Sequence, residues 1–211
     1  MKNRIATGFD FLTPFYDQLA RLIIGKDIVN SQLHFLKSFS ECNRLLILGG
    51  GSGWILEPLC KACPDIQIDY IDLSPKMINA AKRISGKNVR INFILGTEND
   101  IPDRLYDGVI TNFYLDMFEK QTMEKVIEKI KGSITNSGLW VVTDFVNGSE
   151  WNNVILWMMY RFFRVIARIE ATHLPDWQTE IIYADFTLLE SEKFENGFIK
   201  SNVYQITTLS N

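Results

Sequence analysis

The chain has 211 residues, 46% of them hydrophobic and 22% charged, and its formal net charge at pH 7 is −3. These proportions are typical of a folded protein with a sizeable core, and the length suits one large domain. The acidic balance argues against a nucleic-acid-binding surface, and no apolar run reaches the roughly 20 residues of a membrane-spanning helix.

The amino-terminal region, residues 1–42, is predicted to form a helical cap. Residues 9–39 show a mostly helical pattern with a break at 25–27, and the chain start lacks the apolar run of a signal peptide. Three cysteines are too few for a disulfide framework, which favours a cytoplasmic location. Cys60 and Cys63 form a C-x-x-C pair without a second pair or a nearby histidine, so we interpret them as helix thiols and expect no metal site.

Strand-like and helix-like patterns alternate through residues 43–145. Continuous apolar runs predict buried strands, and apolar residues at helical spacing predict helices. In the helix after the second strand, Ser74 is the expected N-cap and Pro75 the first helical residue. The predicted strands are residues 43–48, 66–72, 89–95, 106–113 and 138–145, and the predicted helices are residues 52–63, 74–84 and 119–134. This alternation implies right-handed crossovers and a parallel sheet with helices on both faces.

Two further helices and a hairpin are predicted after residue 145. The helices cover residues 150–170 and 174–185, and the hairpin joins residues 186–194 to 198–206 through a turn at Asn196 and Gly197. No repeat, low-complexity tract or linker divides the chain. We therefore predict a single domain.

A glycine cluster follows the first predicted strand and consists of Gly49, Gly50, Gly51 and Gly53. Glycines at a strand-to-helix turn let a ligand approach the backbone, and the helix start offers unpaired N–H groups. A phosphate loop requires a lysine after the last glycine, and none is present. The dinucleotide pattern G-x-G-x-x-G fails because Trp54 stands at its last position. The pattern that fits is G-x-G-x-G.

With this loop, the chain resembles the class I S-adenosylmethionine-dependent methyltransferases over about residues 16–206. The resemblance is carried by LLILGGGSGW at 45–54, IDLSPKMINAAK at 71–82, GTENDIP at 96–102 and YDGVITNFYL at 106–115. It implies a doubly wound α/β fold whose seven-stranded, mostly parallel sheet ends in an antiparallel hairpin. It also implies S-adenosylmethionine as cofactor and S-adenosylhomocysteine as product. Residues 43–145 would then form the cofactor-binding core, 146–185 a helical substrate-side segment and 186–211 the terminal hairpin.

Asp72 is the predicted acceptor for the ribose hydroxyls, because it ends the second strand about 20 residues past the glycines. The alternative is an acid that stabilises the start of the next helix beside Ser74. Leu73 and Met77 are predicted to pack against the adenine, with core packing as the alternative for Met77.

Thr97 departs from the family pattern, in which an aspartate commonly follows the glycine and accepts a hydrogen bond from the adenine amino group. A threonine hydroxyl accepts less strongly than a carboxylate, and Glu98 is the candidate substitute. Asn112 and Phe113 fall where the family contacts the amino-acid end of the cofactor. Tyr16 matches the family's amino-terminal YD that closes over the site, or is a half-buried helix aromatic.

A sulfonium methyl group is already activated, so alignment supplies most of the acceleration and no fixed triad is expected. A general base is needed only for a protonated nucleophile. The candidate bases are Tyr114, Asp116, Asp144 and His173, although a lone histidine is more often a surface or satisfied residue.

The segment from Trp151 to Glu170 is rich in aromatic residues and carries Arg161, Arg164 and Arg168 on one stripe. It is compatible with a roof over a hydrophobic acceptor, with a peripheral helix on anionic lipid, or with a core-packed helix that has one solvated face.

The leading hypothesis is a methyltransferase for a small, lipophilic acceptor molecule. A non-catalytic module that kept the fold is the alternative, and a nicotinamide oxidoreductase is disfavoured by Trp54. The sequence predicts neither the acceptor nor the oligomeric state.

Overall fold

The computed structural model describes residues 26–86, 90–146 and 174–207. The predictions for Tyr16, for His173 and for the segment that begins with Trp151 lie outside these residues. Within the same ranges, no helix combines the length and apolar character needed to cross a bilayer.

The described strands form one seven-stranded sheet with the order β3-β2-β1-β4-β5-β7-β6. The strands are β1 (Arg44–Leu48), β2 (Gln67–Asp72), β3 (Ile91–Leu95), β4 (Tyr106–Asn112), β5 (Ile134–Phe145), β6 (Phe186–Phe194) and β7 (Ile199–Ile206). The first five pair in parallel, whereas β7 is antiparallel to both β5 and β6. This arrangement confirms the predicted mostly parallel sheet with a terminal antiparallel hairpin.

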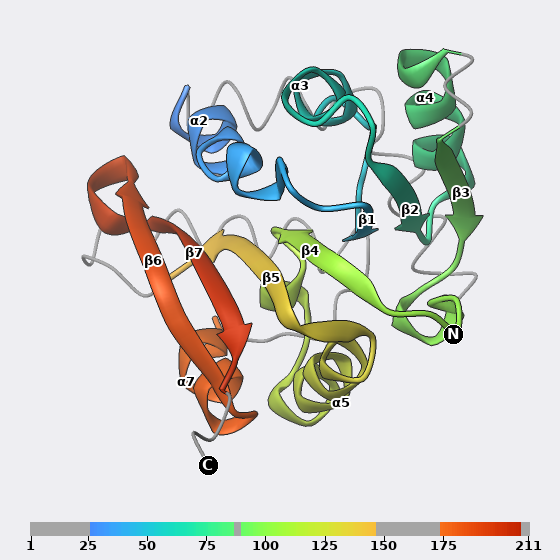
Figure 1. Cartoon of the computed structure of the whole chain (residues 1–211). Coiled ribbons are helices and arrows are strands. Elements are labelled where there is room, and N and C mark those ends of the chain that lie inside the picture. The colour runs from blue at the N-terminus through green and yellow to red at the C-terminus, as the bar shows by residue number, and fades with distance from the viewer. Residues whose placement is uncertain (1–25, 87–89, 147–173, 208–211) are drawn as a thin grey trace.

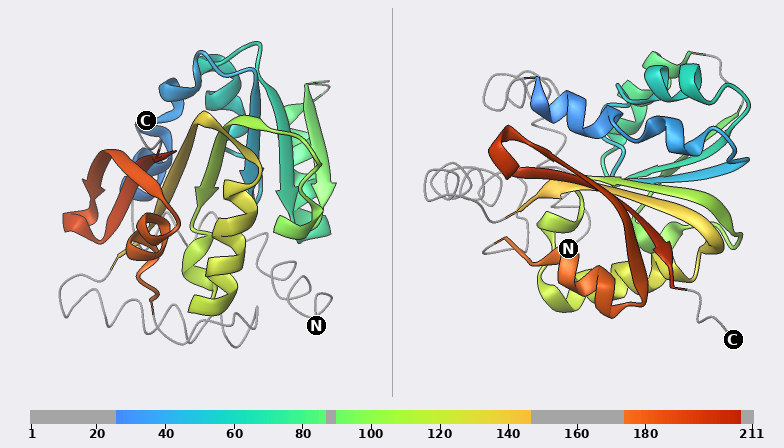
Figure 2. Two further views of the ribbon diagram at one scale, coloured as in Figure 1. Left: turned by 60° about the horizontal axis from the view of Figure 1, so that its bottom comes forward. Right: turned by 60° about the vertical axis from the view of Figure 1, so that its left-hand side comes forward.

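Helices cover both faces of this sheet, as Figures 1 and 2 show. One face carries α2 (Asp27–Leu33), η1 (Leu36–Phe39), α3 (Leu56–Ala62) and α4 (Pro75–Ser85), and the other carries α5 (Lys120–Lys131) and α7 (Trp177–Tyr183). Successive side chains of a strand point to opposite faces. Leu45 and Ile47 accordingly join the core cluster under α3, while Leu46 and Leu48 join the cluster under α5. Both faces of β1 are therefore buried.

The predicted bounds of three helices were wrong. The helix predicted over residues 174–185 covers only Trp177–Tyr183, because Asp176 is its N-cap. The helix predicted from residue 52 begins at Leu56, because Gly53 has a φ of +87°, which is not helical. The helix predicted to reach residue 134 ends at Lys131, and β5 begins at Ile134. Ile134 is 3% exposed and pairs with Tyr106 at the start of β4, so burial and pairing extend this strand past the predicted start at Gly138.

The hairpin connection also differs from the two-residue turn predicted at Asn196 and Gly197. It is a 3₁₀ turn, η4 (Glu195–Gly197), in which Glu195 and Asn196 both have positive φ values. The amide of Glu195 donates to the carboxylate of Asp27 at 3.0 Å. This contact with α2 holds a conformation that the local sequence alone does not favour.

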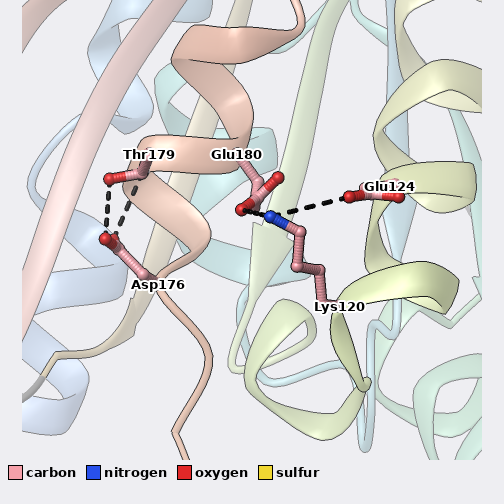
Figure 3. Close-up of polar contacts among 5 residues, drawn as sticks. All are labelled: Lys120, Glu124, Asp176, Thr179 and Glu180. Carbon is pink, nitrogen blue, oxygen red and sulfur yellow. Dashed lines mark hydrogen bonds and ion pairs between the residues drawn. The ribbon is translucent and has the colours of Figure 1, made fainter.

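Helix α7 is fixed to the rest of the fold by polar contacts at its first turns (Figure 3). Trp177, 1% exposed, donates from Nε1 to the backbone oxygen of Phe145 at 2.7 Å. Glu180 forms an ion pair with Lys120 of α5 at 2.6 Å, and the carboxylate of Asp176 caps the helix. The carboxyl end of β5 and the start of α7 are therefore held together.

Replacement of Trp177 by Phe should lower the free energy of unfolding by about 1–3 kcal/mol, because a buried carbonyl loses its hydrogen-bond donor. Urea denaturation measures this change. The control is Tyr183→Phe in the same helix, where the side chain is 75% exposed and no change is expected. Equal denaturation midpoints for Trp177→Phe and the parent chain would contradict the prediction.

Candidate active site

The predicted cofactor residues within the described ranges gather at one edge of the sheet, at the carboxyl ends of β1 to β4. We call this the carboxyl edge. The glycine loop follows β1, Asp72 ends β2, Thr97 and Glu98 follow β3, and Asn112 ends β4. In the sheet, β2 lies on one side of β1 and β4 on the other, so the strand order reverses at β1. Parallel α/β sheets bind ligands at such a switch point.

Three of the four loop glycines are required by packing within the protein. A Cβ atom would lie 2.4 Å from the ring of Tyr114 at Gly49, 2.1 Å from the ring of Tyr70 at Gly50 and 2.6 Å from the backbone of Ala81 at Gly53. At Gly51, by contrast, no atom of the described residues lies within 4 Å of that position. The loop therefore has its open side at Gly51, and the predicted cofactor contacts of the four glycines stay a prediction.

Asp72 bridges two backbone segments at the carboxyl edge. Its Oδ2 accepts from the amide of Gly51 and its Oδ1 from the amide of Ser74, both at 2.8 Å. The structure thus shows the helix-start role considered for this carboxylate. Each carboxylate oxygen can accept a second hydrogen bond, so the ribose contact stays a prediction.

The two residues predicted to pack on the adenine differ in burial. Leu73 is half-buried, whereas Met77 is only 3% exposed. Met77 also supplies the amide that donates to the Ser74 hydroxyl at the start of α4. This burial fits the alternative of core packing for Met77, while the adenine contact of Leu73 stays a prediction.

Thr97 caps a short 3₁₀ helix, η2 (Glu98–Asp100). Its hydroxyl accepts from the amide of Asn99 at 3.3 Å, and the carboxylate of Asp100 accepts from the amide of Thr97 at 2.8 Å. This reciprocal pair is a capping box. Sequence reasoning missed the role of Asp100, although the spacing T-x-x-D could have revealed it. The threonine is therefore explained by local structure.

Tyr114 lies between the glycine loop and the segment after β3. It is 7% exposed, and its hydroxyl donates to Oε2 of Glu98 at 3.3 Å. Burial, followed by the charge of Glu98, raises the pKa of this phenol well above its usual value. A phenol that keeps its proton at neutral pH is a poor general base, so the geometry does not favour that predicted role.

Asp144, fully buried at the end of β5, holds the turn between β4 and α5. Its Oδ2 accepts from the amides of Leu115 and Asp116 at 3.0 and 3.2 Å, and its Oδ1 accepts from the amide of Phe145 at 2.8 Å. These amides belong to the backbone, so the carboxylate of Asp144 acts as a support for η3 (Leu115–Met117).

Asp116, which is half-buried with a buried Oδ1, and the fully buried Asp144 form an acidic pair. Burial raises the pKa of Asp116 to about 7, and burial together with the charge of Asp116 raises the pKa of Asp144. Two neighbouring buried carboxylates resist simultaneous ionisation. The pair therefore retains a proton near neutral pH, and Asp116 has the pKa that suits a general base.

Asn112 ends β4 at the centre of the carboxyl edge, and Phe113 directly follows it. Oδ1 of Asn112 is buried and has no hydrogen-bond partner in the part of the chain that the structure describes. Phe113 has a φ of +49°, which is strained for a bulky residue, and its ring packs 4.7 Å from that of Phe145. Strained backbone of this kind is frequent at functional sites.

The cysteines contribute no ligand cluster to this site. Cys42, Cys60 and Cys63 are free thiols, and burial raises the pKa of Cys42 to about 11. Across the described ranges, no group of three or more His, Cys, Asp or Glu side chains is placed to hold a metal ion.

Comparison with known proteins identifies the domain. A family model described as a methyltransferase domain matches residues 45–138. The solved structure of the N-methyltransferase NodS from Bradyrhizobium japonicum WM9, in complex with S-adenosylhomocysteine, superposes with a TM-score of 0.74. That alignment covers 97% of this chain and 100% of NodS at 15% identity, and so reports on the fold. Residues 45–138 thus match a methyltransferase domain, and the chain as a whole has the fold of a methyltransferase. The resemblance predicted from the four motifs is confirmed.

Two curated relatives match this methyltransferase domain at similar identity. Malonyl-[acyl-carrier protein] O-methyltransferase 1 of Ilyobacter polytropus is 27% identical over 121 residues, which cover 57% of this chain and 44% of the relative. Carboxy-S-adenosyl-L-methionine synthase of Nautilia profundicola is 24% identical over 206 residues, which cover 93% of this chain and 78% of the relative. The match thus spans less than half of the first relative and most of the second.

The raised pKa of Asp116 predicts a pH-dependent stability. This carboxyl holds its proton up to about pH 7 when folded and up to about pH 4 when unfolded. The folded state therefore binds more protons between these values, and its stability falls as the pH rises through this window. Asp116→Asn has no proton to lose, so its stability relative to wild type should rise by of order 1 kcal/mol per pH unit across the window.

Urea unfolding of wild type and Asp116→Asn at pH 5 and pH 8 measures this difference. The matched control is Asp103→Asn, since Asp103 is exposed. A stability difference between Asp116→Asn and wild type that stays constant with pH would show that Asp116 titrates normally.

Proposed function

We propose that the chain is an S-adenosylmethionine-dependent methyltransferase that transfers a methyl group to a small acceptor. The observation that carries this proposal is the convergence of Gly51, Asp72, Glu98 and Asn112 at the switch point of the sheet. The methyltransferase domain over residues 45–138 and the S-adenosylhomocysteine-bound relative NodS support the predicted cofactor.

The residues at the carboxyl edge fit the polar groups of this cofactor. The carboxylate of Asp72 at the end of β2 suits the ribose hydroxyls, and Oδ1 of Asn112 suits the ammonium group of the methionine half. Glu98 is the acceptor for the adenine amino group, because the Thr97 hydroxyl already caps η2. When bound, the cofactor supplies an activated sulfonium methyl group, and the protein's part is to align it and to exclude water.

Asp116 is the general base in this proposal, where the acceptor nucleophile carries a proton. Asp116 lies in η3, the short helix that follows Tyr114. Because η3 comes shortly after the end of β4, Asp116 lies at the same edge of the sheet as Asn112. Asp144 is a positioning residue, since it binds the amide of Asp116. An acceptor that needs no deprotonation would not require Asp116.

A second candidate is a reaction that modifies S-adenosylmethionine itself. It is favoured by the relative named carboxy-S-adenosyl-L-methionine synthase, whose alignment covers 93% of this chain. The non-catalytic alternative loses its main argument, because the capping box gives Thr97 a structural role of its own.

Replacement of Asp72 by Ala should weaken binding of S-adenosylmethionine by about 1–3 kcal/mol, the usual cost of leaving buried polar groups unpaired. Isothermal titration with S-adenosylmethionine and S-adenosylhomocysteine measures the effect. The matched control is Asp65→Ala, where the side chain is 91% exposed at the far end of β2 and no change is expected. Absence of heat with either ligand for the unaltered chain would refute the proposed cofactor.

Mass spectrometry of the nucleoside products separates the two candidate reactions. A methyltransferase converts S-adenosylmethionine to S-adenosylhomocysteine in proportion to methylated acceptor. A new nucleoside of higher mass than S-adenosylmethionine would instead favour the second candidate.

A further inference from the structure

Tyr114 is placed by its ring as well as by its hydroxyl. The ring lies so close to Gly49 that any side chain there would overlap it, and it makes an edge contact with Phe118 at 5.1 Å between centroids. The residue precedes η3, whose backbone is held by Asp144. Three elements therefore fix the direction in which the hydroxyl points.

Glu98 is the group that receives this hydroxyl. Its Oε2 accepts from Tyr114, and its Oε1 accepts from the side-chain amide of Asn99. Two donors thus hold a half-buried carboxylate in one orientation and leave each oxygen a lone pair. The neighbouring Thr97 hydroxyl is committed to the cap of η2.

Asp72 and Glu98 lie on neighbouring strands of the sheet. Asp72 pairs with Leu95 in the register of β2 and β3, and the amide of Gly96 donates to the Asp72 carbonyl at 3.0 Å. Adjacent strands are about 4.8 Å apart, so a nucleoside whose ribose binds at Asp72 extends its base toward the segment after β3. The donor that such an adenine presents there is its exocyclic amino group.

We propose that Tyr114 is a positioning residue that holds the Glu98 carboxylate as the acceptor for the adenine amino group. The inference rests on the proposed function and deepens it, because it assigns the selection of an amino-substituted base to a tyrosine–glutamate pair. An oxo-substituted base would present an acceptor to this fixed carboxylate and would be rejected. Tyr114 is then a determinant of specificity rather than a base in the reaction.

The test compares the dissociation constants of S-adenosylhomocysteine and S-inosylhomocysteine, which differ in the amino or oxo group of the base. The unaltered chain should prefer the amino compound by at least about tenfold, as expected for a hydrogen bond to a charged group. Tyr114→Phe keeps the ring and removes the hydroxyl. It should weaken S-adenosylhomocysteine severalfold while it changes S-inosylhomocysteine little, so the ratio falls.

Two further variants test whether the pair acts as a unit. Glu98→Gln should abolish the preference, and adding Tyr114→Phe to it should change nothing more, because contacting residues are non-additive. Glu98→Asp withdraws the carboxylate from the Tyr114 hydroxyl without touching the core. It should lose the preference even if Tyr114→Phe proves unstable.

The matched control is Tyr106→Phe. Tyr106 is also a buried tyrosine, and its hydroxyl donates to the carboxylate of Asp69 at 2.7 Å, but it lies at the opposite end of β4. Its loss should cost stability and leave the ligand ratio unchanged.

The outcomes distinguish failure of the proposed function from failure of the positioning role of Tyr114. If the unaltered chain binds neither compound, the proposed function fails and this inference fails with it. If it binds S-adenosylhomocysteine and Tyr114→Phe or Glu98→Asp keeps the full preference, only the positioning role is overturned. Tighter binding of S-adenosylhomocysteine by Tyr114→Phe would also overturn it, since the hydroxyl would then compete with the ligand.

Discussion

The carboxylate of Asp72 is the contact on which the geometry of the carboxyl edge depends. One oxygen binds the amide of Gly51 and the other the amide of Ser74, so a single side chain joins the glycine loop to the start of α4. Tyr70 also stabilises the glycine loop, since its hydroxyl donates to the carbonyl of Gly51. These contacts within the protein hold the left-handed glycines of the loop, so a cofactor would meet a preorganised backbone.

Local sequence patterns were sufficient to predict the layers of the fold. Alternating strand and helix patterns gave the parallel sheet, and the expected N-cap at Ser74 is confirmed because its hydroxyl accepts from the amide of Met77. Such signals are carried by residues within one or two turns of each other. The predicted ends of strands and helices were less accurate where pairing with a residue far away in the sequence determines the end. The extra residues of β5 are stabilised by pairing with Tyr106.

The sequence predicted which residues gather at the carboxyl edge better than it predicted the contacts between them. Motif order brought Asp72, Glu98 and Asn112 to one edge, as found. The sequence could not show that Gly49 makes room for Tyr114, or that Asp144 supports η3, because these partners lie 65 and about 29 residues apart in the chain. The sequence interpretation of Thr97 was that it replaces an aspartate of the family pattern. The structure shows that Thr97 caps η2, a helix of three residues.

The turn after β4 connects the two halves of the proposed site. Phe113 adopts a strained positive φ, and the next residue, Tyr114, reaches Glu98 with its hydroxyl. The turn is stabilised in return by Asp144, which binds the amides of Leu115 and Asp116. Backbone hydrogen bonds to a buried carboxylate can offset the free-energy cost of one residue with a strained φ. The proposed cofactor selection through Tyr114 and the proposed proton transfer through Asp116 therefore depend on one short segment, and a change at Asp144 would disturb both together.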